Sequence, residues 1–555
     1  MMSPVEPAAQ QQSHPLWVER LVDRAQALIA VLRSRPTLLS ALCLGVLSVA
    51  IWGRAVADLG LYYDDWALLA GFGDAPSKSP ADLWDACRAF EPNGRPGGCV
   101  YHPLAYLVTG GTVRGYHLLS LVYTGGSAMV LFVLLRRCRM RWGLALAVAA
   151  LWVVFPGSDT TRLWPTASGA QLDLSLYMAG VLLGIAAVHR KGWRSIALHA
   201  AALLIFTGLV LTYEIVIPLI AVTGVLYWLA RPGRAAVVHG AVDLAFGVAF
   251  YVYRTWISPV SSDSNIVVKR ELGDYPDRAR DLLEGTWQSW QDLFAPGTAG
   301  AVLAVLGAAT VIVALVAFRD SRRQILLWLA LAALGVAAAI VAVAAYFPAN
   351  DLYAPRPDTL FNRLNLAAAP AYCLIFVALL GALYTSVLTI SGRMVAIAVV
   401  AALVGAVISW QLEVESQSQA AWQEAWNQET RAAAGIGAAL AEAPPNAAVV
   451  SFGHPLWERG FIPVFTASWD LRGMIDYYDQ VDPPLAIPFL PTASCTRAGV
   501  ALDNVLFIPF GGDSPVWFAN ALSGEGRPVE SQKACLKAVA DWGPPPYWGA
   551  TVTGG

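Results

Sequence analysis

Hydrophobic stretches recur along the chain between residues 37 and 410, and polar segments separate them. A helix needs roughly 20 apolar residues to cross the hydrocarbon core of a bilayer, and eleven stretches approach that length. They cover residues 37–53, 116–135, 143–156, 166–188, 195–212, 215–230, 237–257, 299–318, 325–347, 364–390 and 394–410. This pattern predicts a polytopic α-helical membrane protein with about 11 transmembrane helices in residues 37–410.

Three polar segments interrupt or precede the predicted spans. Residues 1–36 form an N-terminal segment, in which residues 16–33 have the apolar face of a helix that lies on the inner membrane surface. Residues 54–115 and 258–298 form two long loops, and the second contains a predicted helix near 276–294. We expect both loops to lie on the outer side of the membrane.

The tail, residues 411–555, is polar enough to form a separate domain. It begins with a predicted Gln- and Ala-rich helix at about 416–442, which ends before Pro444 and Pro445. Short apolar runs that predict strands follow at 447–452, 461–466 and 504–510. The tail is therefore expected to be a small C-terminal α/β domain in the periplasm.

The distribution of charge predicts the orientation in the membrane. Cytoplasmic loops of membrane proteins are enriched in Lys and Arg, and the basic loops alternate here in phase with the N-terminal segment. These loops are residues 136–141, 189–194, 231–234, 318–323 and 391–393. Together with the N-terminal segment they carry a net charge of +13, whereas the rest of the chain carries −15. The N-terminus is therefore expected in the cytoplasm and the tail outside it.

The composition excludes several classes of protein. Hydrophobic residues make up 57% of the 555 residues and charged residues only 14%, whereas about a quarter of an ordinary soluble chain is charged. A nucleic-acid-binding protein would have a basic surplus, but the formal net charge is −2. Only five of the 37 basic residues are Lys, which is typical of a high-GC bacterial genome. We expect a bacterial inner-membrane protein that contacts lipids and not nucleic acid.

Four of the seven cysteines lie in the predicted outer segments. Cys87 and Cys99 belong to the first loop, and Cys495 and Cys535 belong to the tail. An oxidising compartment permits disulfides, so we predict one bridge in each pair. A zinc site would need closer spacing with His.

Ionisable residues near the bilayer are costly and therefore informative. Asp64 and Asp65 follow the first span and precede an apolar run, so they are either helix N-caps or, if burial or a like charge raises the pKa, a general base. Asp159 and Arg162 lie in a short outer turn, where a surface ion pair is the simpler interpretation. These residues all lie at the outer ends of predicted spans.

Two further groups lie at the same depth. Glu214 stands between two apolar runs, where a carboxylate needs a partner or a water-lined cavity. Arg363 either snorkels to the surface or binds a phosphate through its bidentate donors. Only Asp173 and Asp243 fall inside predicted spans. Because a transporter more often places ionisable residues at mid-membrane, the pattern favours an active site at the outer interface.

The order of these motifs resembles that of the GT-C superfamily of polytopic glycosyltransferases, which use polyprenyl-phosphate sugars. The nearest pattern is that of bacterial relatives of the dolichyl-phosphate-mannose O-mannosyltransferases and of the lipid A aminoarabinose transferases. The matching residues are Asp64-Asp65, His102-Pro103-Leu104, Tyr116-His117-Leu118-Leu119, Phe155-Pro156 with Trp164, Tyr213-Glu214 with Pro218, and Pro348 and Asn350 followed by Arg363 and Pro370. The match covers roughly residues 37–375 as an ordered series.

The chain departs from the family pattern at four positions. His102 stands where the family has Arg, Phe155 where it has His, and Tyr213 where it commonly has Lys. Asp159 lies about one position from the usual Glu. Because of these departures, the identities of the sugar and the acceptor are not carried over from the family. The tetratricopeptide tail of the eukaryotic relatives is absent.

The resemblance implies an inverting glycosyltransferase that moves a sugar from a polyprenyl-phosphate donor to a periplasmic acceptor glycan, lipid or protein. Asp64 or Asp65 would be the general base. Donor phosphate or sugar binding is expected from Arg363, Glu214, Asp159, Arg162, His102 and Asn350. No cofactor is certain, because some members of the superfamily bind a divalent metal ion and others do not.

Two other functions fit the same polar residues. A flippase or transporter of lipid-linked sugars would have the same outer cavity but no need for a base. A non-catalytic subunit of glycan assembly would bind a glycan or a partner through its tail. Replacing Asp64 with Asn separates transport, which should survive, from transfer, which should not.

Overall fold

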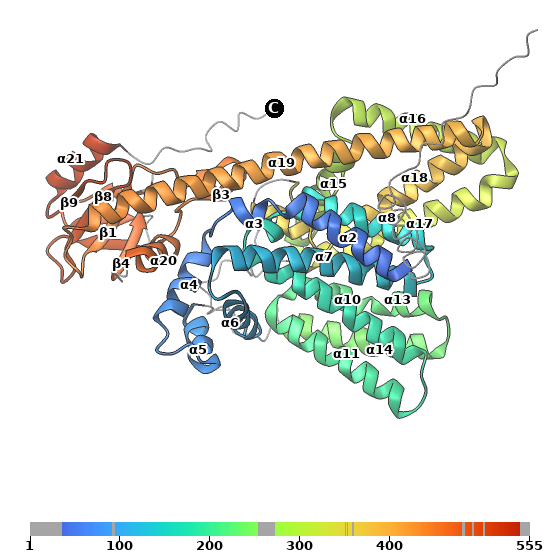
Figure 1. Cartoon of the computed structure of the whole chain (residues 1–555), viewed down its shortest axis with the longest axis horizontal. Coiled ribbons are helices and arrows are strands. Elements are labelled where there is room, and N and C mark those ends of the chain that lie inside the picture. Colours follow the sequence, from blue (N-terminus) through green and yellow to red (C-terminus); the bar gives the residue numbers. More distant parts are fainter. Residues whose placement is uncertain are drawn as a thin grey trace, which may run out of the picture.

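The computed structural model describes residues 36–90, 95–253, 272–349, 351, 353–357, 360–479, 483–490, 493–502 and 506–543. Its helices form a bundle, and one long helix, α19 (Arg393–Leu440), extends from the bundle to a domain that contains every described strand (Figure 1). Residues 1–35, where a surface helix is expected, lie outside the described residues.

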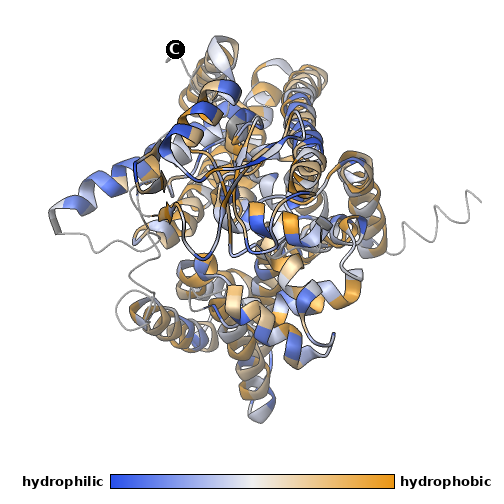
Figure 2. Ribbon diagram, turned by 90° about the vertical axis from the view of Figure 1, so that its left-hand side faces the viewer, coloured by the Kyte–Doolittle hydropathy of each residue, from blue (hydrophilic) through white to orange (hydrophobic). Residues whose placement is uncertain are grey.

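Nine helices among the described residues are long and apolar enough to cross a membrane, so the chain is a polytopic helical membrane protein. They are α2 (Pro36–Trp52) extended by α3 (Ala55–Asp58), α7 (Val113–Arg137), α10 (Gly169–Val188), α11 (Trp193–Thr212), α14 (Arg234–Val252), α16 (Gly297–Ala317), α17 (Arg319–Val343), α18 (Ala369–Ser391) and α19. Hydrophobic residues dominate the bundle helices in Figure 2, which looks from the C-terminal domain towards the bundle. Outward-facing side chains such as Val305 and Val316 of α16 are exposed, as expected of residues that face lipid.

Two of the eleven predicted spans do not form helices of this length. Residues 143–156 form the shorter α8 (Trp142–Val154), and residues 215–230 are divided among η3 (Glu214–Val216), α12 (Ile217–Ala221) and α13 (Thr223–Ala230). Pro218 lies in the first turn of α12, where its missing backbone N–H is tolerated. The helix is interrupted at Val222, and the hydroxyl of the next residue, Thr223, is placed to donate to the Ile220 carbonyl (2.8 Å) or the Asp243 carboxylate (2.7 Å). The prediction of a continuous helix over 215–230 is therefore wrong.

The last predicted span and the predicted tail helix form one helix. α19 has 48 residues, which at 1.5 Å per residue is a length of roughly 70 Å. Residues 406–434 contain neither Gly nor Pro, so nothing in the chain interrupts the helix where the predicted membrane domain ends at residue 410. The bundle and the C-terminal domain are therefore joined by a rigid element instead of a linker (Figure 1).

The two long segments that the sequence predicts outside the membrane contain helices where they are described. Residues 54–112 contain α4 (Asp64–Asp74), α5 (Pro80–Phe90) and α6 (Gly98–Thr109), and the predicted helix near 276–294 is α15 (Tyr275–Phe294), which follows η5 (Leu272–Asp274). A disulfide between Cys87 and Cys99 joins α5 to α6 with a Cα–Cα distance of 5.4 Å. α7 begins after Thr112, whose side chain accepts a hydrogen bond from the Gly115 N–H and so caps the helix.

The C-terminal domain has an α/β fold. Its described residues form nine strands, which are β1 (Ala448–Phe452), β2 (Trp457–Glu458), β3 (Ile462–Pro463), β4 (Leu485–Pro488), β5 (Ser494–Cys495), β6 (Gly499–Leu502), β7 (Leu506–Pro509), β8 (Val516–Asn520) and β9 (Gly526–Pro528). In the main sheet, of order β4-β1-β8-β9, β1 is parallel to both of its neighbours and β9 is antiparallel to β8. β5, β6 and β7 form an antiparallel sheet, and β2 pairs with β3.

The sheets of this domain pack with two helices and a second disulfide. α20 (Ser468–Asp479) precedes β4, and α21 (Gln532–Trp542) follows β9; η8 (Arg459–Phe461) lies between β2 and β3. Every residue of β1 and β8 is buried, as expected of central parallel strands. Cys495 is bonded to Cys535 of α21, with a Cα–Cα distance of 5.8 Å. Both predicted disulfides are confirmed.

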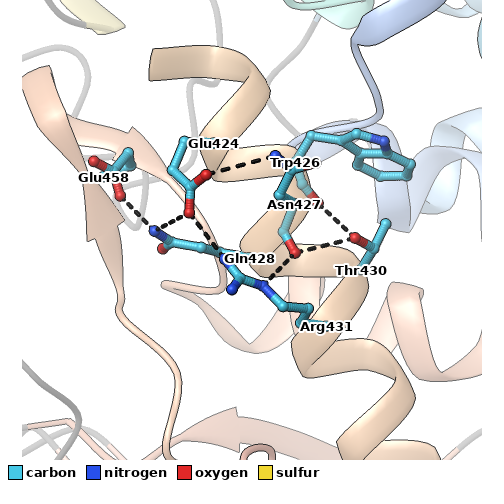
Figure 3. A network of polar contacts seen from close by, with 7 residues as sticks. All are labelled: Glu424, Trp426, Asn427, Gln428, Thr430, Arg431 and Glu458. Carbon is cyan, nitrogen blue, oxygen red and sulfur yellow. Dashed lines mark hydrogen bonds and ion pairs between the residues drawn. The ribbon is translucent and has the colours of Figure 1, made fainter. Parts of the chain in front are cut away.

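Polar side chains connect α19 to the small β2–β3 sheet (Figure 3). Gln428 donates hydrogen bonds to Glu458 of β2 (2.7 Å) and to Glu424 (3.2 Å), and Arg431 donates to Glu424 (2.9 Å). Further along, Gly435 lies so close to the backbone after β8 that an added Cβ would be 1.8 Å from the Ala521 carbonyl oxygen. The second half of α19 therefore belongs to the C-terminal domain.

We expect thiol labelling of the denatured, unreduced protein to modify three cysteines, namely Cys43, Cys138 and Cys373, because the other four form disulfides. After reduction all seven should react. Mass spectrometry of the alkylated peptides measures both counts. Labelling of seven cysteines before reduction in protein purified from its native membrane would contradict both bridges.

Candidate functional site

Five parts of the chain at one end of the helix bundle surround a cavity of about 150 Å³ that contains several charged side chains. They are the loop between α2 and α7, the turn between α8 and α10, the first turns of α10, the turn after α11, and the segment before α18. Alternate connections of an up-and-down bundle meet at the same end, which is why segments far apart in the sequence meet here. The charged and histidine side chains of the lining are Asp64, Arg95, His102, Asp173 and Arg363.

Asp64 and Asp65 begin α4, but their side chains have different surroundings. Asp64 lines the cavity and accepts a hydrogen bond from the indole N–H of Trp469 (3.1 Å). Asp65 is 3% exposed and accepts hydrogen bonds from the N–H groups of Tyr62 (2.9 Å) and Thr166 (2.8 Å) and from the Thr166 hydroxyl. Burial raises the pKa of Asp65 well above its usual value, and the two N–H groups oppose this shift. Asp65 therefore joins two segments, whereas Asp64 faces the cavity.

The backbone is strained immediately before these acids. Tyr63 has a φ of +50°, which is unfavourable for a bulky L-residue and costs roughly 1–3 kcal/mol. The ring of Tyr63 packs edge to face against Trp164 (6.0 Å between centroids) and Trp469 (5.3 Å). These contacts and the hydrogen bond from Tyr62 to Asp65 hold the turn from both sides.

Arg363 reaches the cavity from η7 (Leu360–Asn365). Its guanidinium lies over the ring of Trp164, 5.0 Å from the centroid, and its Nε is buried without a hydrogen-bond partner. Trp164 is itself fixed, because its indole N–H donates to the Tyr62 carbonyl (3.0 Å). An arginine with an unsatisfied donor in a cavity is suited to bind an anion such as a phosphate.

Glu214 forms a bidentate ion pair with Arg95, with distances of 2.8 Å (Nη2–Oε1) and 3.1 Å (Nε–Oε2). The guanidinium of Arg95 also lies over the ring of Tyr213, 4.8 Å from the centroid. This pair joins the loop between α2 and α7 to the turn after α11. The sequence predicts that the Glu214 carboxylate needs a partner, and this partner is Arg95, which lines the cavity.

Asp159 and Arg162 lie inside the protein next to the cavity and are not part of its lining. Arg162 is 4% exposed and donates to the carbonyl oxygens of Trp152 (2.9 Å) and Phe155 (2.7 Å) at the end of α8. The side chain of Asn362 donates to Asp159, whose pKa is raised by burial. The expected surface ion pair is not observed, and this placement favours structural roles for both residues.

His102 lines the cavity from α6, and burial lowers its pKa to about 4. Its imidazole is therefore neutral near pH 7. Asn350, the remaining predicted binding residue, lies outside the described residues. Within the described ranges, no group of three or more His, Cys, Asp or Glu side chains is placed to hold a metal ion.

Sequence reasoning did not select Asp173, Arg95 or Trp469 as site residues, and it named Trp164 only as part of a motif. Asp173 of α10 lines the cavity, is 3% exposed, and has an Oδ2 without a hydrogen-bond partner; its position inside an apolar span was a usable signal. Arg95 and Trp164 also line the cavity. Trp469 comes from the C-terminal domain, and only the tertiary structure brings it to Asp64.

Replacing the two arginines should change the stability of the protein by different amounts. Arg162→Ala removes buried hydrogen bonds and the stacking of the guanidinium over Trp52 (4.5 Å), so we expect unfolding to require about 3 kcal/mol less free energy. Arg363→Ala removes the stacking of the guanidinium over Trp164 but no hydrogen bond among the described residues, and should change the stability by less than about 1 kcal/mol. Tryptophan fluorescence during unfolding in detergent measures both. Equal destabilisation would contradict this assignment.

No known protein family has a model that matches this chain, and no curated protein is similar to it. The residues around the cavity and their geometry must therefore carry the functional conclusion. These residues include two carboxylates, Asp64 and Asp173, and an arginine with an unsatisfied donor, Arg363, and they lie at the end of a bundle of apolar helices.

Proposed function

We propose that this protein is an inverting glycosyltransferase of the GT-C type, which moves a sugar from a polyprenyl-phosphate donor to an acceptor outside the cytoplasm. One observation carries the proposal. Asp64 and Arg363, from segments almost 300 residues apart, line the same cavity at one end of a bundle of apolar helices. This arrangement provides a base and an anion-binding group where a membrane-bound donor and a water-soluble acceptor meet.

In the proposed reaction, an acceptor hydroxyl attacks the anomeric carbon of the donor sugar. The new C–O bond forms as the bond between that carbon and the phosphate oxygen breaks, and the phosphate leaves with the electron pair as polyprenyl phosphate. Asp64 takes the hydroxyl proton, which as general-base assistance contributes roughly 10²–10⁴-fold. Arg363 stabilises the negative charge on the departing phosphate. Attack opposite the leaving group inverts the anomeric configuration.

The size of the cavity fits a single sugar. Pockets for drug-sized ligands measure roughly 300–1,000 Å³, whereas this cavity measures about 150 Å³. Its polar lining offers hydrogen-bond partners for sugar hydroxyls, among them Asp173 with its unsatisfied Oδ2 and the neutral His102. Arg95, held by Glu214, adds a fixed donor. These groups support transfer of one monosaccharide at a time.

A lipid-linked donor also has a place to lie. An apolar groove of about 350 Å³ is lined by Ile217, Pro218, Val341 and Phe347, among others. Ile217 directly follows η3, which holds the Glu214 that binds Arg95 in the cavity. An isoprenoid chain in this groove would keep its phosphate near the cavity. The basic loops at the other ends of the helices support an orientation in which the cavity faces the periplasm.

Replacing Asp64 with Asn should lower kcat for sugar transfer at least about 100-fold, because the amide cannot accept the proton. Binding of the polyprenyl-phosphate donor should persist. The matched control is Asp74→Asn, which changes an exposed carboxylate at the other end of the same helix. Transfer from radiolabelled polyprenyl-phosphate pentoses and hexoses measures the effect. If wild-type protein and Asp64→Asn both move these lipids across vesicles without transferring sugar, the protein is a flippase.

Replacing Arg363 with Ala should also lower kcat, by at least about 100-fold, because the charge that forms on the leaving phosphate loses a positioned donor. Arg363→Lys retains the positive charge but not the planar fork, and should recover part of the rate. Both variants should unfold like the wild type. Wild-type turnover by Arg363→Ala would remove the phosphate-binding role from this residue.

A further inference from the structure

The C-terminal domain packs directly against the helix that carries Asp64. α20 lies beside α4 (Figure 1), and Gly473 of α20 lies so close to the α4 backbone that an added Cβ would be 2.5 Å from the Ala67 nitrogen. At this position the two helices touch without an intervening side chain. A flexibly attached accessory domain would not require such a close approach.

An aromatic cluster fixes this contact. Trp66, which directly follows the two acids, is 1% exposed and lies between α19 and α20. Its ring stacks on Trp426 of α19 (6.0 Å) and meets Tyr477 of α20 edge to face (5.7 Å). Its indole N–H donates to Glu429 of α19 (3.1 Å). Burial of these large rings stabilises the interface between the two helices through the hydrophobic effect. α20 is therefore held in one position against α4.

Two contacts then connect α20 to the cavity. The indole N–H of Trp469 donates to Oδ1 of Asp64 (3.1 Å), and the Trp469 ring packs against Tyr63, the residue with the strained φ. Tyr63 packs in turn against Trp164, over which Arg363 lies. A continuous series of contacts thus runs from the C-terminal domain past the candidate base to the candidate phosphate-binding residue.

The start of α20 is itself anchored. Asp470 is buried and accepts hydrogen bonds from the N–H groups of Thr466 (2.8 Å) and Ala467 (3.1 Å), which precede the helix. These bonds fix the backbone on both sides of Trp469. Because the carboxylate torsion of an aspartate has a broad energy minimum, a donor held in this way restricts Asp64 to one orientation.

We propose that Trp469 is a positioning residue of the active site, which holds the carboxylate of Asp64 in the orientation that accepts the proton of the acceptor hydroxyl. The C-terminal domain is then a component of the catalytic site. This inference rests on the proposed transferase function. It assigns to the domain a role that no motif in its sequence indicates, and it explains why α19 is rigid between the bundle and the domain.

The test replaces Trp469 with Phe, which retains a ring against Tyr63 but removes the N–H donor. A hydrogen bond to a charged group contributes enough for kcat to fall about 10-fold. The KM values for the donor and the acceptor should not change. Trp457→Phe, in the same domain but away from α4, is the matched control and should behave as the wild type.

The pH profile provides a readout that a purely structural role would not move. Loss of a donor favours the protonated carboxylate, so the acidic limb of kcat should move to higher pH in Trp469→Phe. Asp65 on α4 and Asp470 on α20 also lie near Asp64, and burial raises the pKa of Asp470 to about 7. Both variants retain these groups, so the comparison with Trp457→Phe isolates the effect of the hydrogen bond.

The outcomes separate the two proposals. If the wild type transfers no sugar from the polyprenyl-phosphate pentoses and hexoses, the proposed function and this inference both fail. If the wild type is active and Trp469→Phe matches Trp457→Phe in kcat and pH profile, only the positioning role is overturned. A rise in KM with unchanged kcat would also overturn it, because the ring would then bind substrate and not orient the base.

Discussion

The hydrogen bonds of Asp65 hold together the region on which the rest of the site depends. This buried carboxylate accepts hydrogen bonds from the N–H groups of Tyr62, in its own turn, and of Thr166, which lies just before α10. An unpartnered carboxylate would be costly to bury, so the two segments must meet for either to be stable. The strained turn at Tyr63 is thereby fixed, and Asp64 on one side of Asp65 faces the cavity while Trp66 on the other side enters the interface with the C-terminal domain.

The bilayer imposes the second constraint. Ionisable side chains are expensive within hydrocarbon, and the long apolar helices leave few of them there. The segments that connect the helices must therefore supply the polar chemistry, and alternate connections meet at one end of the bundle. Arg95 with Glu214 and Asp159 with Asn362 are contacts of this kind, and each pairs segments more than 100 residues apart. Ionisable residues at this end of the bundle thus have two roles. Some, such as Glu214 and Asp159, hold the segments together, and others, such as Asp64 and Arg363, face the cavity.

The C-terminal domain adds a rigid element to this assembly. α19 continues from the bundle into the domain without a break, and Gln428 connects it to Glu458 of β2 (Figure 3). A helix of that length transmits position, so the domain can place Trp469 beside Asp64 with little conformational freedom. A site of this construction suits chemistry in which a lipid-borne donor and a soluble acceptor must meet in one geometry, because orientation of the reacting groups contributes much of the rate.

The sequence by itself determined the class of protein, most helix positions and the two disulfide pairs. It also indicated Asp64, Asp65 and Arg363 as residues of interest. Both were possible because the length of an apolar stretch, and an ionisable residue at its end, are local properties of the chain. It could not distinguish Asp64 from Asp65, since adjacent residues share the same sequence context and differ only in their partners. It also did not reveal the structural role that the fold gives Arg162, the break in the helix at Val222, or the continuity of α19. Tertiary structure decided these points, and it brought Trp469 to the site, because contacts between residues hundreds of positions apart depend on the packing of the whole chain.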